Sequence, residues 1–273
     1  MSEKELQYPG GTIIDFEGLD CSFKETNARA FTEKIVSMFP TCPTLYESFP
    51  RYDKESSKFV QKWLNGNYDR QILMDHPEAV DSFYSIDRFD FWHSFQGDYP
   101  ITTHTFYRMR MFMFIFDRYN ISNAIYNPMS GDMPSVEDFT FDNRVYAIPQ
   151  PDVVVWMRMP SFDAFKVILA EKKNKDKNES DIEFIKKVWE RSEYAIENNL
   201  FEQAGIHLIT VDCLEEYPVE LYKNQIMSDK CFSVASAEDH NVHMCGYRIK
   251  GKEELANEVW EKVTSYLIST QAD

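Results

Sequence analysis

The chain has 273 residues, of which 43% are hydrophobic and 27% are charged, and its formal net charge is −16 at pH 7. This composition is ordinary for a folded protein and argues against disorder. The negative charge disfavours nucleic-acid polymers and anionic membranes as partners, so any phosphate ligand needs a local cluster of Lys, Arg and backbone N–H groups. Small phosphorylated molecules are the expected partners.

The compartment and a possible metal site can be judged from the first residues and the cysteines. The start MSEKELQYPG lacks the features of a signal peptide, and the apolar run Met111 to Phe116 is too short to span a bilayer. The 5 cysteines suit free thiols, which predicts a cytoplasmic protein. Cys231, His240, His243 and Cys245 are close together, but the gap after Cys231 fits no common zinc-finger spacing, which disfavours zinc.

The first elements form half of a βαβ unit. Thr12 to Phe16 is a short β-branched and apolar run, which predicts a buried parallel strand. Apolar residues then recur at helical spacing from Ala28 to Met38, and Pro40 ends the pattern.

The rest of the chain continues this alternation. Strands are expected at Thr44 to Phe49, Met111 to Phe116, the VVVWM run after Pro151-Asp152, and Ile206 to Val211; helices are expected at Lys54 to Leu64 and from Leu255 to Tyr266. The pattern predicts an α/β fold with a parallel sheet covered by helices on both faces, in a single domain over residues 1–273. Ligands in such sheets bind beyond the carboxyl ends of the strands. Residues 171–181 are charged and lack apolar side chains, and residues 215–250 show no clear period and are interpreted as an insertion.

The turn after the first strand is a partial phosphate loop. Gly18 and Lys24 have the separation of G-x-x-x-x-G-K-[ST], but Phe23 replaces the second Gly and Glu25 replaces the hydroxyl residue. On the motif alone, an ordinary turn with a surface lysine is an equal alternative. Arginines are the other chemical signal, because a guanidinium grips phosphate oxygens in a bidentate way. Arg51, Arg88 and Arg118 are candidates for an acceptor phosphate, with surface or interdomain ion pairs as the alternative.

Several segments together resemble one family. GLDCSFKET is similar to the thymidylate kinase loop GLDGSGKST, and four further segments follow in the family's order: Phe49-Pro50-Arg51, Tyr84 to Phe89, Asp117-Arg118-Tyr119 with Ser122 and Tyr126, and Pro151-Asp152. Arg51 falls one place earlier than the family's arginine. The likeness covers residues 12 to about 212.

The resemblance implies a P-loop three-layer sandwich that uses ATP and Mg²⁺ to convert dTMP to dTDP. Asp20 would bind the acceptor sugar, Tyr84 would stack on the base, Arg88 would contact the base edge, Arg118 would hold the acceptor phosphate, and Tyr126 would line the pocket. The implied catalytic residues are Lys24, Asp117 and Arg118, with Glu25 and Asp117 at the metal. The implied donor site contains Gly18, Ser22, Lys24, Glu25, Thr26, Lys173 and Lys175. The implied acceptor site contains Asp20, Phe49, Arg51, Tyr84, Arg88, Arg118, Ser122 and Tyr126. The family commonly forms homodimers, so a homodimer is expected from resemblance alone.

Departures from the family pattern leave alternatives open. Cys21 stands where a loop arginine would be, and the lid-like segment 171–181 offers lysines in place of arginine, which predicts slower chemistry or a second source of positive charge. Phe23 and Glu25 alter the part of the loop that cradles phosphate. A kinase-like binding or scaffold protein without turnover is therefore an alternative, as is a dUMP or deoxynucleoside kinase.

Overall fold

A five-stranded parallel sheet forms the centre of the protein. The computed structural model describes residues 11–69, 71, 75–93, 112–129, 131–171, 181–218 and 246–270. The strand order is β2-β3-β1-β4-β5, and each neighbouring pair runs parallel. The strands are β1 (Ile13–Gly18), β2 (Thr44–Ser48), β3 (Met113–Asp117), β4 (Val153–Arg158) and β5 (His207–Asp212). A central sheet of five parallel strands in this order confirms the predicted α/β fold class.

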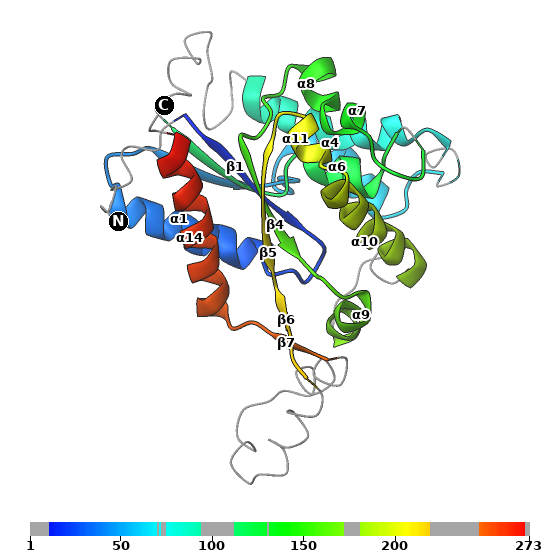
Figure 1. Cartoon of the computed structure of the whole chain (residues 1–273). Helices are drawn as coiled ribbons and strands as arrows, with labels where there is room; N and C mark the ends of the chain where they lie inside the picture. Colours follow the sequence, from blue (N-terminus) through cyan, green and yellow to red (C-terminus); the bar gives the residue numbers. More distant parts are fainter. Residues whose placement is uncertain are drawn as a thin grey trace.

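Helices cover both faces of the sheet (Figure 1). On one face lie α1 (Lys24–Met38), which contacts β1, β2 and β3, and α14 (Lys252–Thr270), which contacts β5. The opposite face carries α6 (Ile121–Tyr126) against β1 and α11 (Leu200–Gln203) against β5, with α10 (Ile182–Glu197) packed on both helices. The remaining helices are η1 (Glu55–Ser57), α2 (Lys58–Leu64), α4 (Pro77–His93), α7 (Val136–Phe139), α8 (Phe141–Tyr146) and α9 (Phe162–Glu171).

Burial on both faces explains why the central strands have continuous apolar runs. Every residue of β1 and β3 is buried, and the side chains of Ile14, Phe16 and Ile115 form part of the main core. Three acidic residues interrupt this apolar pattern: Asp15 and Glu17 in β1 and Asp117 at the end of β3. Charge in a buried strand is unfavourable without partners, and two of these acids, Glu17 and Asp117, lie near the carboxyl ends of their strands, where ligands bind in parallel sheets.

The predicted strands and helices are confirmed, with differences of a few residues at their ends. The expected insertion at 215–250 differs in one respect, since its two ends pair as an antiparallel ribbon of β6 (Leu214–Glu216) and β7 (Tyr247–Ile249). These strands are too short for their period to be visible in the sequence. The Cys and His group at 231–245 lies outside the described residues.

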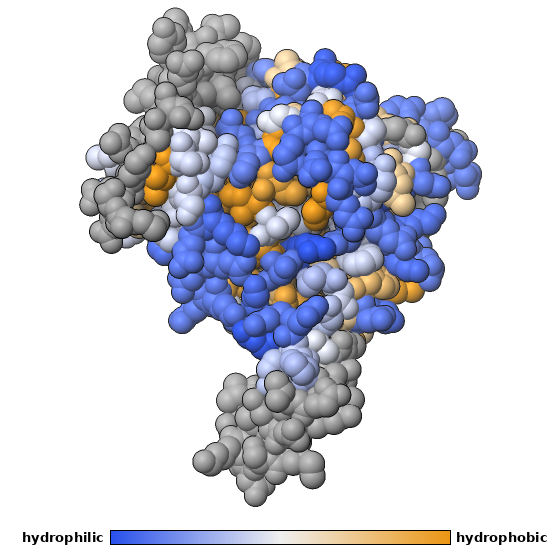
Figure 2. All heavy atoms as spheres, in the orientation of Figure 1, coloured by the Kyte–Doolittle hydropathy of each residue, from blue (hydrophilic) through white to orange (hydrophobic). Residues whose placement is uncertain are grey.

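One face of the molecule is mostly polar where its residues are described. Figure 2 shows hydrophilic side chains over much of the face seen in Figure 1, with hydrophobic patches between them, as the net charge of −16 suggests. Among the residues described, no helix has the length and apolar character needed to cross a membrane.

Candidate functional site

The turn between β1 and α1 has the backbone of an anion-binding loop. Cys21 and Phe23 adopt left-handed conformations with φ of 64° and 61°, and Phe23 caps α1 without a side-chain hydrogen bond. When left-handed residues alternate with right-handed ones, successive backbone N–H groups point toward one centre. The first N–H groups of a helix also have no acceptor within the helix. Phe23 thus takes a conformation that glycine adopts more easily, and this conformation costs about 1–2 kcal/mol for a residue with a side chain. The turn therefore adopts at position 23 the left-handed conformation for which glycine is the usual residue.

Glycine is the residue type that fits at position 18, where this turn starts. Its φ is +148°, and a Cβ at this position would lie 2.5 Å from Ser22 Oγ and 2.6 Å from the Met157 carbonyl oxygen. The turn therefore packs directly against β4. Ser22 is fully buried, and its hydroxyl has no hydrogen-bond partner among the described residues.

Lys24 and Asp20 lie together at the mouth of the turn. The Nζ of Lys24 donates to the Leu19 carbonyl at 3.2 Å and is 3.6 Å from Asp20 Oδ1. Asp20 also forms an ion pair with Arg118, which follows β3. Burial and the charge of Arg118 lower the pKa of Lys24. Two cations from neighbouring strands thus share a single carboxylate.

Arg118 is held in an unusual backbone conformation. Its φ is 61°, its backbone N–H donates to the Phe16 carbonyl at 3.1 Å, and its guanidinium lies 5.4 Å from the centre of the Tyr126 ring. Burial works against its charge, but Asp20 and other neighbours outweigh that effect and raise the pKa of Arg118. Arg118 is therefore a fixed cation at the carboxyl edge of the sheet.

Asp117 presents a carboxylate oxygen to the same edge. Its Oδ2 accepts a hydrogen bond from Ser48 at 3.1 Å, whereas its buried Oδ1 has no hydrogen-bond partner in the described part of the chain. Burial raises the pKa of Asp117, and the charges of Lys24 and Arg118 oppose that rise. An unpartnered buried carboxylate oxygen near a phosphate loop fits the oxygen ligands that Mg²⁺ prefers.

The other predicted donor and metal residues have different surroundings. Glu25 is exposed at the first turn of α1 and pairs with Arg29 at 3.0 Å, while Thr26 is half-buried in the same turn. Lys173 and Lys175 lie outside the described residues. Their predicted roles stay predictions.

Two of the predicted acceptor arginines are engaged by carboxylates. Arg51 pairs with Asp87 at 2.9 Å and Asp90 at 2.8 Å, and Arg88 pairs with Asp142 at 2.5 Å. Arg88 is only 1% exposed. Breaking such a buried pair is unfavourable, so a phosphate or base contact would have to replace the carboxylate.

Two of the three predicted aromatic residues of the acceptor site, Phe49 and Tyr84, differ in burial. Phe49 is 3% exposed and packs in the core against Phe91, Phe116 and Tyr119. Tyr84 is half-buried on α4. The structure therefore brings together Asp20, Lys24, Asp117, Arg118, Ser122 and Tyr126, and it places Phe49, Arg51 and Arg88 in intramolecular contacts.

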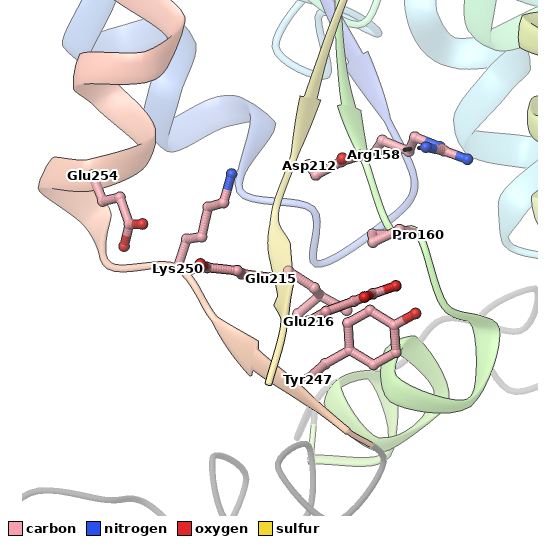
Figure 3. Close-up of a pocket in the computed structure, with 9 residues that line it drawn as sticks. Arg158, Pro160, Asp212, Glu215, Glu216, Tyr247, Lys250 and Glu254 are labelled. Atoms are coloured by element: carbon pink, nitrogen blue, oxygen red, sulfur yellow. Dashed lines mark ion pairs between the residues drawn. The ribbon is translucent and has the colours of Figure 1, made fainter. Parts of the chain in front are cut away.

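A pocket that was not identified from the sequence lies beyond the ends of β4 and β5 (Figure 3). It measures about 610 Å³, and its lining includes Asp212, Glu216 and Tyr247. The end of β5 beside the pocket contacts the turn after β1, because Cys213, directly after β5, donates its thiol to the Ser22 carbonyl at 3.2 Å, although no residue of that turn lines the pocket. Only the general rule that ligands bind at the strand ends could have indicated it.

The comparisons with known proteins yield a likeness of fold. No family model matches the sequence, and no curated protein matches it. The chain is similar to the crystal structure of thymidylate kinase from Ehrlichia chaffeensis, with a TM-score of 0.48 and 14% identity over 87% of this chain and 97% of that one. Similarity at this level assigns no activity to the chain.

Proposed function

We propose that this protein phosphorylates a pyrimidine deoxynucleoside monophosphate, most readily dTMP, with ATP as donor. The observation that carries the proposal is the meeting of Lys24 and Arg118 at the Asp20 carboxylate, where the loop after β1 faces the loop after β3. Phosphoryl transfer needs two phosphate groups aligned and their charge neutralised, and little covalent chemistry beyond that. One cation on each loop meets this need.

The donor phosphates would lie in the turn that begins at Gly18. Backbone N–H groups of the turn and of the first residues of α1 converge there, and Lys24 adds a positive charge. The pocket beyond β4 and β5 would take the donor base and ribose. Its volume of about 610 Å³ is in the range of small-ligand sites, its carboxylates suit ribose hydroxyls, and Tyr247 offers an aromatic face.

The acceptor phosphate would bind Arg118. Without a ligand, the Asp20 carboxylate occupies this guanidinium. An incoming phosphate carries more charge than a carboxylate and would replace it, which leaves Asp20 available to a sugar hydroxyl. Tyr126, whose ring lies beside Arg118, would form the wall of this acceptor pocket.

Asp117 is the residue best placed to hold Mg²⁺, because its Oδ1 is buried without a hydrogen-bond partner in the part of the chain described. When bound, Mg²⁺ would neutralise phosphate charge. Glu25 has its carboxylate at the surface with Arg29 and contributes less to this proposal.

The test is a transfer assay with ATP, Mg²⁺ and each nucleoside or nucleoside monophosphate in turn. Diphosphate is expected from dTMP with the wild type, and a loss of at least a hundredfold with Lys24→Ala and with Arg118→Ala. Lys34→Ala is the matched control, because Lys34 is on the same helix and stacks on Trp260, away from the turn.

Each other outcome points to an alternative. No product from any acceptor, with nucleotide binding retained, would indicate a binding protein without turnover. Equal use of dUMP would remove the assignment of the base but leave the reaction. Phosphorylation of deoxynucleosides alone would indicate a nucleoside kinase.

A further inference from the structure

Glu17 is a buried carboxylate directly beneath the loop that carries Arg118. It is 0% exposed, and its contacts reach a segment more than one hundred residues away in the sequence. Its Oε1 accepts hydrogen bonds from the backbone N–H groups of Tyr119 at 3.0 Å and Ser122 at 2.9 Å. Its Oε2 accepts the hydroxyl of Ser122 at 2.6 Å. The carboxylate therefore ties β1 to the first turn after β3.

The direction of the Ser122 hydroxyl follows from these contacts. A serine hydroxyl has one proton, and Ser122 donates it to Glu17 Oε2. The lone pairs of Ser122 Oγ are then left for the guanidinium of Arg118, whose Nη1 lies 3.4 Å away. Glu17 thereby orients the Ser122 hydroxyl so that its lone pairs, and not its proton, face Arg118.

The same carboxylate also supports the backbone of Arg118. The left-handed conformation of Arg118 has a φ of 61° and costs about 1–2 kcal/mol for a residue with a side chain. Such a conformation persists only where its surroundings hold it. The hydrogen bond from Tyr119 N–H to Glu17 anchors the next residue, so the strained residue has a fixed neighbour on its carboxyl side.

We infer that Glu17 is a positioning residue for phosphoryl transfer, which acts through Ser122 to aim Arg118 at the acceptor phosphate. The inference rests on the proposed function for its catalytic part. Glu17 touches neither substrate in this arrangement. It sets the position of the cation that does, and a displacement of about 1 Å in such a group lowers rates by about a hundredfold.

Glu17→Gln is the main variant, because it keeps an oxygen for the two backbone N–H groups. Its amide would donate to Ser122, which forces the hydroxyl proton to turn toward the positive guanidinium of Arg118. We expect kcat/KM for the acceptor to fall ten- to a hundredfold, with KM for ATP changed less than twofold. Ser122→Ala should give a loss of similar size, and Glu17→Gln should add less than twofold in the Ser122→Ala background.

Asp15→Asn is the matched control. Asp15 is on the same strand and the same face as Glu17, is equally buried and lies next to it: burial, followed by the charge of Glu17, raises the pKa of Asp15. No hydrogen bond among the described residues joins Asp15 to the loop after β3, so this variant tests a change beside Glu17 that leaves the loop contacts in place. We expect its acceptor KM to equal that of the wild type. Two outcomes would overturn the inference: losses that multiply in the double variant, or equal rises in KM for donor and acceptor, as a purely structural role for Glu17 would produce.

A second measurement does not depend on activity. The Nε–H signal of Arg118, assigned by its loss in Arg118→Lys, should report restricted rotation of the guanidinium in the wild type and in Asp15→Asn. It should report faster rotation in Glu17→Gln and in Ser122→Ala. Unchanged rotation would refute the positioning of Arg118 by Glu17 even if the enzyme is active. If the wild type transfers no phosphate, the proposed function fails, and the rotation data still decide whether Glu17 positions Arg118.

Discussion

Replacement of Gly18 by alanine tests whether the turn depends on close packing against β4. A Cβ at this position would lie 2.6 Å from the Met157 carbonyl oxygen, a backbone atom that cannot move alone, and 2.5 Å from Ser22 Oγ. Overpacking in a filled core costs about 1–3 kcal/mol. The backbone at φ +148° adds a further strain of about 1–3 kcal/mol for any residue with a side chain. We expect Gly18→Ala to lower the free energy of unfolding by about 2–6 kcal/mol in total.

Gly131→Ala separates the two contributions. Gly131 has a similar φ of +137°, and a Cβ there meets nothing within 4 Å. Urea unfolding of both variants should therefore show Gly18→Ala less stable than Gly131→Ala by about 1–3 kcal/mol, which is the overpacking contribution. Gly18→Ala should also raise KM for ATP, whereas Gly131→Ala should not. Equal destabilisation by the two replacements would refute the packing argument.

Three further predictions concern charge and the pocket. Burial, followed by the charge of Glu17, raises the pKa of Asp15 well above its ordinary value. The folded protein then retains a proton that the unfolded chain releases above about pH 4, and this group makes the protein less stable as the pH rises toward the raised pKa. Urea unfolding should accordingly show that the free energy of unfolding of Asp15→Asn, relative to that of the wild type, increases from pH 4 to pH 7. A difference between the two proteins that does not change with pH would contradict this. Arg88→Met should lower the stability of the fold by about 3–5 kcal/mol, because it removes the cation that pairs with the buried Asp142. The double variant Arg88→Met with Asp142→Leu should recover most of that stability, and thermal unfolding of both variants tests this. Tyr247→Ala should raise KM for ATP about five- to a hundredfold if its ring stacks on the base, whereas Tyr247→Phe should not, and steady-state kinetics that show no change for Tyr247→Ala would remove the base from this pocket.

Much of the fold could be predicted because its central strands are buried on both faces. Runs such as VVVWM in β4 contain only apolar residues, and such runs in regular alternation with helices specify a parallel sheet. The ribbon of β6 and β7 could not be predicted in this way. Each strand has three residues, and their pairing joins positions more than thirty residues apart, so no local period marks them.

The candidate site could be predicted where residues lie on the segment that follows a strand. Arg118 directly follows β3 and Lys24 begins the helix after β1, and the structure brings both to Asp20. The partners of Arg51 and Arg88 are carboxylates on α4 and α8, which the chain brings close only by folding. Glu17 is a related case: the sequence shows an acid in an apolar strand, but the hydrogen-bond partners that suggest its role, Tyr119 and Ser122, lie more than one hundred residues away and meet it only in the folded chain.

The balance of charge around the turn explains why a protein with a net charge of −16 could still bind a triphosphate. Lys24 and Arg118 are both already paired with Asp20, so their charges are partly neutralised before a ligand arrives. Glu17 is taken up by hydrogen bonds from the loop below Arg118, and the raised pKa of Asp15 favours its neutral form. In the proposed function, the attraction for phosphate would then have to come from the backbone N–H groups at the start of α1 and from a metal ion at Asp117, in addition to the lysine. In such a site the ion is part of the electrostatic balance, because without it the donor phosphates would meet carboxylates that the two cations only partly offset.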